Sequence, residues 1–324
     1  MTCYRPIAMT DPSRPAGALT LAGGWCWFDR VEVLERGRRE MIAAHDLPEE
    51  VRERLTAPRA SLHGLTWDVP RLMGIVNATP DSFSDGGTYD PVAQARALAE
   101  EADLLDIGGE STRPGAQTVP EEEEIRRIRP VTDALRGLRP LSIDTRKAGV
   151  AEASGAEMVN DVSAMLYDPA MADTVARMGA SICLMHAQGA PETMQDDPRY
   201  ADVLLDVYDH LAERIAVAEA AGIPRDRIVV DPGIGFGKTM AHNLALIRGL
   251  SAFHGLGCPI LLGVSRKGFI GRIGHAATPA DRMPGSVAVA LAGVAQGAQI
   301  LRVHDVGATR QALALWMAST GDMK

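Results

Sequence analysis

The chain has 324 residues and a formal net charge of −9, so it can hold one large domain and gives no reason to expect a nucleic-acid or membrane-surface partner. Hydrophobic residues make up 46% and aromatic residues only 4%. This mix of small and branched aliphatic side chains suits parallel strands that are buried on both faces. Without a secretory leader or a run of about 18 apolar residues, the sequence predicts a protein of the cytoplasm.

The cysteines give no sign of a metal site. Cys3, Cys26, Cys183 and Cys258 are widely spaced and form no Cys-x-x-Cys pair, so neither a zinc site nor a disulfide framework is predicted. We expect free, mostly buried thiols in a reducing compartment.

Residues 1–70 differ in pattern from the rest of the chain. They contain an apolar and aromatic patch at 19–28, a charged segment at 31–40 and a helical segment near 48–55. Two interpretations are open for this extension. It is either a hairpin and a helix that cover the N-terminal face of the following domain, or a small subdomain.

From residue 71 onward, short apolar runs alternate with helical segments rich in Ala, Leu, Glu and Arg. Strands that alternate with helices pair in parallel through right-handed crossovers, and eight such units close a (β/α)₈ TIM barrel. The alternative is an open doubly wound sheet. Residues 71–324 are therefore predicted to form one α/β domain, with only a short helix after Asp144. The predicted strands are 72–78, 104–108, 141–144, 158–162, 181–186, 228–231, 260–264 and 300–303, and the predicted helices include 92–101, 121–135, 200–221, 243–250 and 281–296.

Every predicted strand carries a polar residue near its C-terminal end or is followed directly by one. One such residue is ordinary capping of the next helix. In a β/α barrel, however, all the C-terminal strand ends meet at one rim, where functional residues lie. The polar residues at these ends include Asn77, Asp106, Asp144, Asn160, His186, Asp231, Ser265 and Arg302.

One set of rim residues suits a planar heterocycle. Asp144 and Asp231 can accept adjacent N–H groups, Asn160 can donate and accept, and Lys267 can donate to a ring oxygen or nitrogen. This inventory matches a 2-amino-4-oxo-pterin and, on chemistry alone, a guanine equally well.

A second set suits an anion. Arg302, His304 and Arg113 are donors, and Asn77 offers an amide oxygen to a metal or an amide N–H to a phosphate. Magnesium binds phosphates with few protein ligands of its own. A ring site beside an anion site indicates a ring that bears a phosphate leaving group.

Simpler interpretations exist for single residues. Asp144 alone could cap the next helix, Asn160 and Asp161 could form a turn, and His186 is interpreted as a satisfied rim histidine. The glycine-rich segment 233–239 is not a P-loop, because Pro232 stands where that motif needs a glycine. It is not a dinucleotide fingerprint either, because Lys238 takes the place of the third glycine.

Together these motifs resemble those of the dihydropteroate synthases. The resemblance lies in residues 73–87 (MGIVNATPDSFSDGG), 106–115 (DIGGESTRPG), 142–145 (SIDT), 160–161 (ND), 231–238 (DPGIGFGK), 265–267 (SRK) and 302–305 (RVHD), in family order. The departure is at the N-terminus, where about 70 residues precede the first motif.

The resemblance implies a TIM barrel, usually a homodimer, that condenses a pterin pyrophosphate with p-aminobenzoate as an alkyl- or aryl-group transferase. Residues 79–88 match the first loop, which looks like a lid over the pyrophosphate. By motif position, the implied pterin residues are Asp144, Asn160, Asp231 and Lys267; the implied pyrophosphate and Mg²⁺ residues are Asn77, Arg302 and His304; those of the second loop are Thr112, Arg113 and Pro114; and those of the p-aminobenzoate side are Phe236 and Ser265, with Lys238 as a further substrate-binding residue.

Two other functions are weighed against this one. A folate-binding methyltransferase domain would share the pterin residues but would not need the Ser-Arg-Lys, Thr-Arg-Pro-Gly and Arg-x-His elements. A non-catalytic pterin-binding paralogue should lose anion-site residues, whereas Asn77, Arg302 and His304 are all present.

Overall fold

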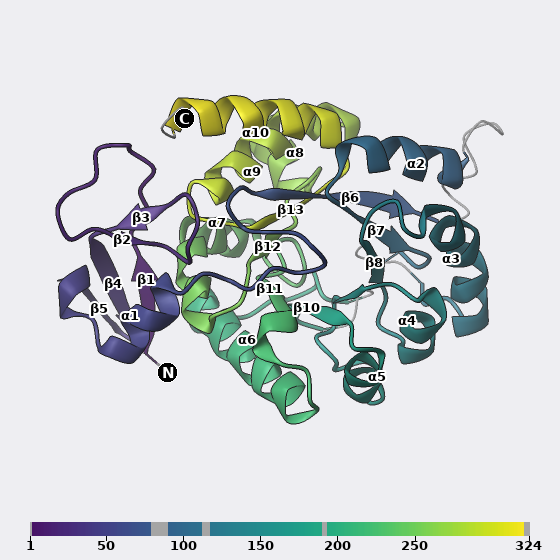
Figure 1. Ribbon diagram of the computed structural model, residues 1–324, viewed down its shortest axis with the longest axis horizontal. Coiled ribbons are helices and arrows are strands. Elements are labelled where there is room, and N and C mark those ends of the chain that lie inside the picture. Colours follow the sequence, from purple (N-terminus) through teal and green to yellow (C-terminus); the bar gives the residue numbers. More distant parts are fainter. Residues whose placement is uncertain (1, 79–89, 112–116, 190–192, 321–324) are drawn as a thin grey trace.

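A computed structural model describes residues 2–78, 90–111, 117–189 and 193–320 (Figure 1). Within these ranges, eight parallel strands form one sheet in the order β11-β10-β9-β8-β7-β6-β13-β12. The strands are β6 (Arg71–Asn77), β7 (Leu104–Gly108), β8 (Leu141–Asp144), β9 (Met158–Asp161), β10 (Ser181–Met185), β11 (Ile228–Asp231), β12 (Leu261–Leu262) and β13 (Ile300–Val303).

The two edge strands of this sheet meet and close it. Val230 in β11 forms an isolated parallel bridge with Ile260, directly before β12, and its N–H donates to the Pro259 carbonyl at 3.0 Å. The sheet is therefore a closed (β/α)₈ barrel, as predicted, and not the open doubly wound alternative.

The helices lie outside the barrel between successive strands (Figure 1). The unit after β8 has the short helix that the sequence predicts, only 7 residues long. The helices are α2 (Pro91–Glu101), α3 (Glu121–Leu135), α4 (Ala148–Ser154), α5 (Met171–Met178), α6 (Val203–Ala220), α7 (Met240–Arg248), the 3₁₀ segment η4 (Leu250–Leu256), α8 (Gly268–Ile273), α9 (Met283–Val294) and α10 (Val306–Thr320).

The barrel has two apolar layers. The larger one lies between the strands and the helices and consists mainly of Leu, Ile, Val and Ala, in keeping with the low aromatic content. The smaller one fills the N-terminal half of the barrel interior with Met73, Leu104, Met158, Cys183 and other strand residues. The buried carboxylates Asp106, Asp144 and Asp231 lie beyond this layer, in the C-terminal half, where the site lies.

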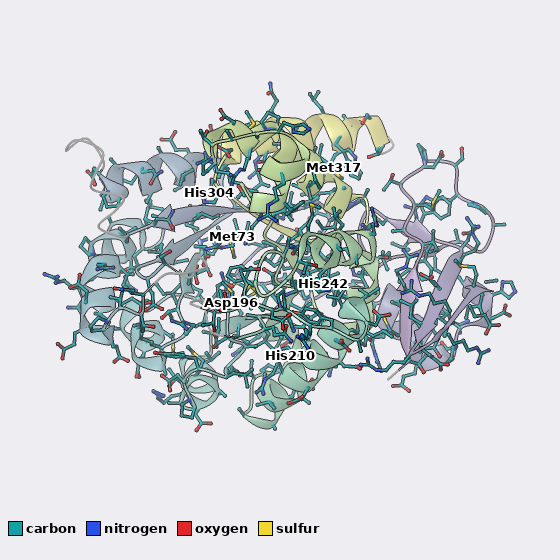
Figure 2. The ribbon with its side chains drawn as sticks, turned by 180° about the vertical axis from the view of Figure 1, so that it is seen from behind. Met73, Asp196, His210, His242, His304 and Met317 are labelled. Carbon is teal, nitrogen blue, oxygen red and sulfur yellow. The ribbon has the colours of Figure 1, made fainter. Side chains whose placement is uncertain are left out.

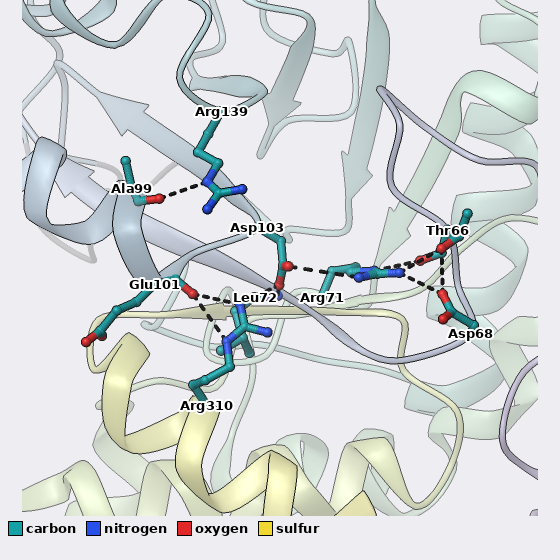
Figure 3. Close-up of polar contacts among 9 residues, drawn as sticks. All are labelled: Thr66, Asp68, Arg71, Leu72, Ala99, Glu101, Asp103, Arg139 and Arg310. Carbon is teal, nitrogen blue, oxygen red and sulfur yellow. Dashed lines mark hydrogen bonds and ion pairs between the residues drawn. The ribbon is translucent and has the colours of Figure 1, made fainter. Parts of the chain in front are cut away.

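Residues 57–70 cover the N-terminal mouth of the barrel. Leu62 and Trp67 are buried against the inner apolar layer, and the Trp67 indole N–H donates to the Ala60 carbonyl at 2.7 Å. Two hydrogen bonds hold the start of β6 beside this segment (Figure 3). Arg71 Nε donates to the Thr66 carbonyl at 2.7 Å, and the Leu72 N–H donates to Asp103 at 2.7 Å.

The first part of the extension forms a separate small sheet with its own core. Strands β1 (Cys3–Pro6), β4 (Arg30–Glu35) and β5 (Arg38–Ala43) pair antiparallel. Strands β2 (Leu19–Thr20) and β3 (Trp27–Phe28) form a second pair, and helix α1 (Glu49–Thr56) completes the unit.

This sheet lies beside the barrel (left in Figure 1) and contacts it near η4 and α9. Ser251 donates to the Pro6 carbonyl at 2.7 Å, and the Trp25 indole donates to the Val294 carbonyl at 2.8 Å. The strands of the extension therefore lie at the side of the barrel, and the segment after α1 covers the N-terminal face of the barrel. All four cysteines are free and buried. No helix in the described ranges is long and apolar enough to cross a membrane.

Candidate active site

Buried polar side chains gather inside the C-terminal half of the barrel. Asp106, Asp144, Asn160 and Asp231 are exposed by 0%, 6%, 3% and 5%, on four different strands. A buried carboxylate is costly unless it accepts hydrogen bonds, so the partners of each group indicate what the site is built to hold.

Arg302 joins two of these carboxylates. Its Nε donates to Asp106 at 2.6 Å and its Nη2 donates to Asp144 at 2.8 Å. Burial alone would lower the pKa of Arg302, but the two carboxylates raise it above its usual range. The sequence assigned Arg302 to the anion; in the structure its guanidinium is engaged at the floor of the site.

From the sequence, Asp106 was placed among the polar residues of the rim but was given no role, although it is central here. Besides Arg302, it accepts hydrogen bonds from Ser142 at 2.6 Å and from the Asn160 amide at 3.0 Å. The signal was present, because an acidic residue stands between Leu105 and Ile107 in a strand that is buried throughout. Asp106 holds Asn160 and Arg302 in place.

Asp144 keeps one oxygen without a protein partner. Its Oδ1 is buried and has no hydrogen bond within the described part of the chain. Burial raises the pKa of Asp144 to about 7, although Arg302 lowers it. Asp144 does not cap α4, because Lys147 occupies the N-cap position without a side-chain bond. The unpaired oxygen is therefore available to an N–H donor of a ligand.

Asn160 and Asp161 have separate tasks. Asn160 points inward to Asp106, whereas Asp161 accepts from the Ser163 N–H at 2.8 Å and the Met165 N–H at 2.7 Å. The turn interpretation thus holds for Asp161, and Asn160 belongs to the site.

Asp231 and Lys267 line the side nearest the glycine-rich loop. One Asp231 oxygen accepts from the Gly233 N–H at 2.7 Å. The Lys267 ammonium lies 4.1 Å from the centre of the Phe236 ring, a cation–π contact. Burial raises the pKa of Asp231, while Gly233 and then Lys267 and Lys238 lower it.

Ser265 and His304 form a pair at the ends of neighbouring strands. His304 Nδ1 lies 2.9 Å from Ser265 Oγ, which also accepts from the His304 N–H at 3.1 Å. Arg266 points away, and its Nε donates to Asp305 at 2.9 Å. Asn77 is half-buried at the end of β6.

Lys238 is buried against the segment after β10. Its Nζ lies 2.9 Å from His186 Nδ1, 3.2 Å from the His186 carbonyl and 2.9 Å from the Phe236 carbonyl. An ammonium has three N–H bonds, and these acceptors can use all of them. The substrate contact that the sequence predicted for Lys238 stays a prediction beside these contacts.

A buried ionic cluster joins the residues that follow β7 to α3 and to the residues that follow β8, and it was also missed. Glu110 accepts from Lys147 at 2.7 Å and from the Val119 N–H at 2.7 Å, and Arg146 donates to it as well. Glu124, in the first turn of α3, pairs with Lys147 and is buried. Thr112, Arg113 and Pro114, together with residues 79–88, lie outside the described residues.

The floor of the site thus offers an acceptor at Asp144, an amide at Asn160, a second carboxylate at Asp231 and a cation at Lys267. A flat ring with an amidine-like edge can satisfy all of them. No group of three or more His, Cys, Asp or Glu side chains that could hold a metal by itself occurs in the described ranges. Asn77 can supply an amide oxygen, which fits Mg²⁺ only if an anion brings further ligands.

Residues 73–304 match the family model described as pterin binding enzyme. The match covers most of the barrel and includes Asn77, Asp144, Asn160, Asp231 and His304. The chain therefore belongs to the pterin-binding enzyme family.

The relatives narrow the class further. The chain is 50% identical over 266 residues to a dihydropteroate synthase of Neisseria meningitidis serogroup B, covering 78% of this chain and 93% of the relative. A solved dihydropteroate synthase of Xanthomonas albilineans with 4-aminobenzoic acid matches with a TM-score of 0.76 at 49% identity, covering 82% of this chain and 98% of that one. The same enzyme in complex with 7,8-dihydropteroate matches with a TM-score of 0.73 at 45% identity, covering 82% and 99%. Within its family the chain belongs with the dihydropteroate synthases, which are transferases of folate biosynthesis.

Proposed function

We propose that the protein joins 6-hydroxymethyl-7,8-dihydropterin pyrophosphate to p-aminobenzoate and releases 7,8-dihydropteroate and pyrophosphate. The observation that carries this proposal is the unpaired, buried oxygen of Asp144, between Asn160 and Arg302 at the mouth of the barrel. The complexes of the Xanthomonas albilineans enzyme with 4-aminobenzoic acid and with 7,8-dihydropteroate support the choice of substrates.

The pterin lies, in this proposal, on the floor of the site. Asp144 accepts from its amidine-like edge, Asn160 and Asp231 bond the remaining ring donors and acceptors, and Lys267 donates to the ring. Asp106 fixes Asn160 and Arg302 from below, since it already accepts from both. The ring would remove the cost of the unpaired Asp144 oxygen.

The pyrophosphate belongs at the outer edge of the floor. His304 and Arg302 donate to it, with Arg113 as a further donor, and Asn77 would hold Mg²⁺ through its amide oxygen. When bound, Mg²⁺ would supply positive charge to the leaving phosphate oxygens. Two carboxylates, Asp106 and Asp144, hold the guanidinium of Arg302. In this proposal the same guanidinium also donates to the anion.

The p-aminobenzoate belongs on the side of the glycine-rich loop. Phe236 and Ser265 line that side, with Thr112, Arg113 and Pro114 of the second loop as the other proposed contacts. The Phe236 ring is half-buried and lies beside Lys267.

The reaction is a substitution at the methylene carbon attached to the pterin ring. The bond from carbon to the pyrophosphate oxygen breaks, the arylamine nitrogen forms the new bond to carbon, and the nitrogen then loses a proton. Donors aimed at the leaving group stabilise the charge that develops there. The pterin, held by the ionised Asp144, supports positive charge on the methylene, which favours a dissociative path without a covalent enzyme intermediate.

Substitutions test this division of labour. Asp144→Ala and Lys267→Ala should weaken the binding of the free pterin by about 10-fold or more, since each removes a charged partner. His304→Ala should leave binding of the free pterin unchanged and lower turnover. Arg302→Ala should affect both, because this residue also holds Asp144. Calorimetry with the pterin and steady-state kinetics measure the two effects, and equal small effects of all four substitutions would contradict the proposal.

We further propose the division into a 1–70 extension and a 71–324 barrel domain, and a homodimer in the cytoplasm. Helix α9 reads MPGSVAVALAGV, without a charged residue, yet Ala288 and Ala292 are exposed. The neighbouring α10 exposes 68% of Leu315. An apolar face of this kind on the outside of a barrel fits a second copy of the chain.

A further inference from the structure

The glycine-rich loop after β11 lies directly against the segment after β10. Gly233 and Gly237 have φ values of +69° and +59°. A Cβ at Gly233 would lie 1.8 Å from the His186 carbonyl oxygen, and one at Gly237 would lie 2.5 Å from the Gln188 carbonyl oxygen. Both positions need glycine, for the backbone conformation and for the close approach.

Polar contacts from the same segment hold this loop at several points. Tyr200 donates to the Gly237 carbonyl at 2.7 Å, and Gln195 donates to the Gly235 carbonyl at 2.7 Å. From the other side, Asn243 accepts from the Gly235 N–H at 2.7 Å. The peptides next to Phe236 are therefore fixed on both sides. Figure 2 labels Asp196 in the segment after β10, and His210 and His242 in the helices α6 and α7 that follow the segment and the loop.

Lys238 and His186 form the innermost of these contacts. Lys238 is exposed by only 3% and His186 by 6%. The ammonium donates to the Phe236 carbonyl and to two acceptors on His186, its carbonyl and its Nδ1. With the ammonium as donor, Nδ1 accepts and the neutral imidazole carries its proton on Nε2. Burial, and then Lys238, lowers the pKa of His186 to about 2, and burial also lowers the pKa of Lys238 to about 7.

The target of these bonds is the carbonyl of Phe236. The ring of this residue packs against Lys267 at 4.1 Å, so its backbone position sets where the ring and the cation meet. A buried hydrogen-bonded network of this type can fix a single loop conformation.

We propose that Lys238 and His186 are a positioning pair that fixes Phe236, and thereby sets the affinity for p-aminobenzoate but not for the pterin. This proposal rests on the proposed assignment of Phe236 to the p-aminobenzoate side. Neither residue touches the reacting atoms; both act through the loop.

Two substitutions at His186 separate positioning from packing. Asn places an amide oxygen near the position of Nδ1 and can still accept from Lys238, whereas Leu fills similar space without an acceptor. His186→Leu should raise KM for p-aminobenzoate by about 10-fold at a smaller change in kcat, and His186→Asn should restore most of it. Lys238→Met, which removes all three donors, should behave like His186→Leu. The dissociation constant of the free pterin should stay within about 2-fold in all three variants.

The controls make the outcome decisive. Arg177→Met, which breaks an exposed ion pair with Glu152, should match the wild type. Turnover by the wild type in the same assay tests the proposed function, and the ratio of variant to wild type tests the pair. If Lys238→Met does not fold, the two His186 variants still decide. Equal KM values for His186→Asn and His186→Leu, or a parallel loss of pterin binding, would overturn the proposal.

Discussion

Asp144 and Asp106 both accept hydrogen bonds from the guanidinium of Arg302, but the two carboxylates differ in how many other partners they have. Asp106 is saturated by Ser142, Asn160 and Arg302, whereas Asp144 receives only Arg302. Burying a carboxylate with an unpaired oxygen costs free energy, and a ligand N–H removes that cost. The empty protein thus carries a local penalty that the pterin relieves on binding.

This arrangement predicts that pterin binding depends on pH. The pKa of Asp144 is raised from 3.8 to about 7, so below that pH the carboxyl is protonated and loses the charge that strengthens its hydrogen bonds from the ring. Affinity for the free pterin should therefore fall as the pH decreases through about 7, by up to about 10-fold per unit. Calorimetry from pH 5.5 to 8.5 measures it. The Asp144→Asn variant should bind the free pterin weakly, with an affinity that does not change over the same pH range. If the affinity of this variant fell with decreasing pH as in the wild type, Asp144 would be excluded as the titrating group.

At this scale, the sequence was sufficient for residues that end a strand. Asp144, Asn160 and Asp231 stand at such ends, and all are buried at the rim as expected. The role of Asp106 was missed because this residue lies within a strand, where the alternation of inward and outward side chains had to be known. The partners of Lys238 were out of reach, because His186 lies 52 residues away and its contact depends on how two loops pack.

The strands were predicted well because each is a short apolar run bounded by polar or glycine residues. β7, β8, β11 and β13 have the predicted bounds, whereas β12 is only Leu261–Leu262 within a predicted 260–264. Helices α6, α7 and α9 differ from prediction by one to three residues at their ends, where capping and loop contacts decide. Barrel closure between β11 and β12 follows from strand geometry and not from a local pattern.

The segment that covers the N-terminal mouth gives a prediction at the scale of elements. Trp67 is exposed by 5% and packs on the apolar interior of the barrel. Trp67→Ala should lower the free energy of unfolding by about 3–5 kcal/mol, since it leaves a cavity. Urea unfolding followed by circular dichroism measures it. Leu138→Ala, at a side chain that is 56% exposed, is the control, and a similar midpoint for both variants would mean that the segment is not part of the core.

The extension shows what the sequence could not place in the molecule as a whole. Its apolar patch and helix were recognised. The pairing of β1 with β4, in which Cys3 lies opposite Leu34, and the contacts of the extension with Ser251 and Val294 of the barrel were not predicted. Such long-range contacts leave no local pattern. The small sheet has its own core and lies beside the barrel, away from the polar rim.

Assembly gives the prediction at this scale. If α9 lies in a dimer interface, Ala288→Glu should convert a dimer to a monomer, because it buries an unpaired charge. Size-exclusion chromatography with light scattering measures the mass. Ala153→Glu is a matched control at an exposed position of α4, on the other side of the barrel (Figure 1). A monomeric wild type, or a dimer that survives Ala288→Glu, would contradict this interface.

The measurement that tests the central claim most directly is an end-point assay. Purified protein is incubated with Mg²⁺, 6-hydroxymethyl-7,8-dihydropterin pyrophosphate and p-aminobenzoate, and dihydropteroate and pyrophosphate are quantified. We predict equal amounts of both products, formed only when both substrates and Mg²⁺ are present. Folded protein that binds the pterin but forms no dihydropteroate would contradict the account and favour a non-catalytic pterin-binding protein.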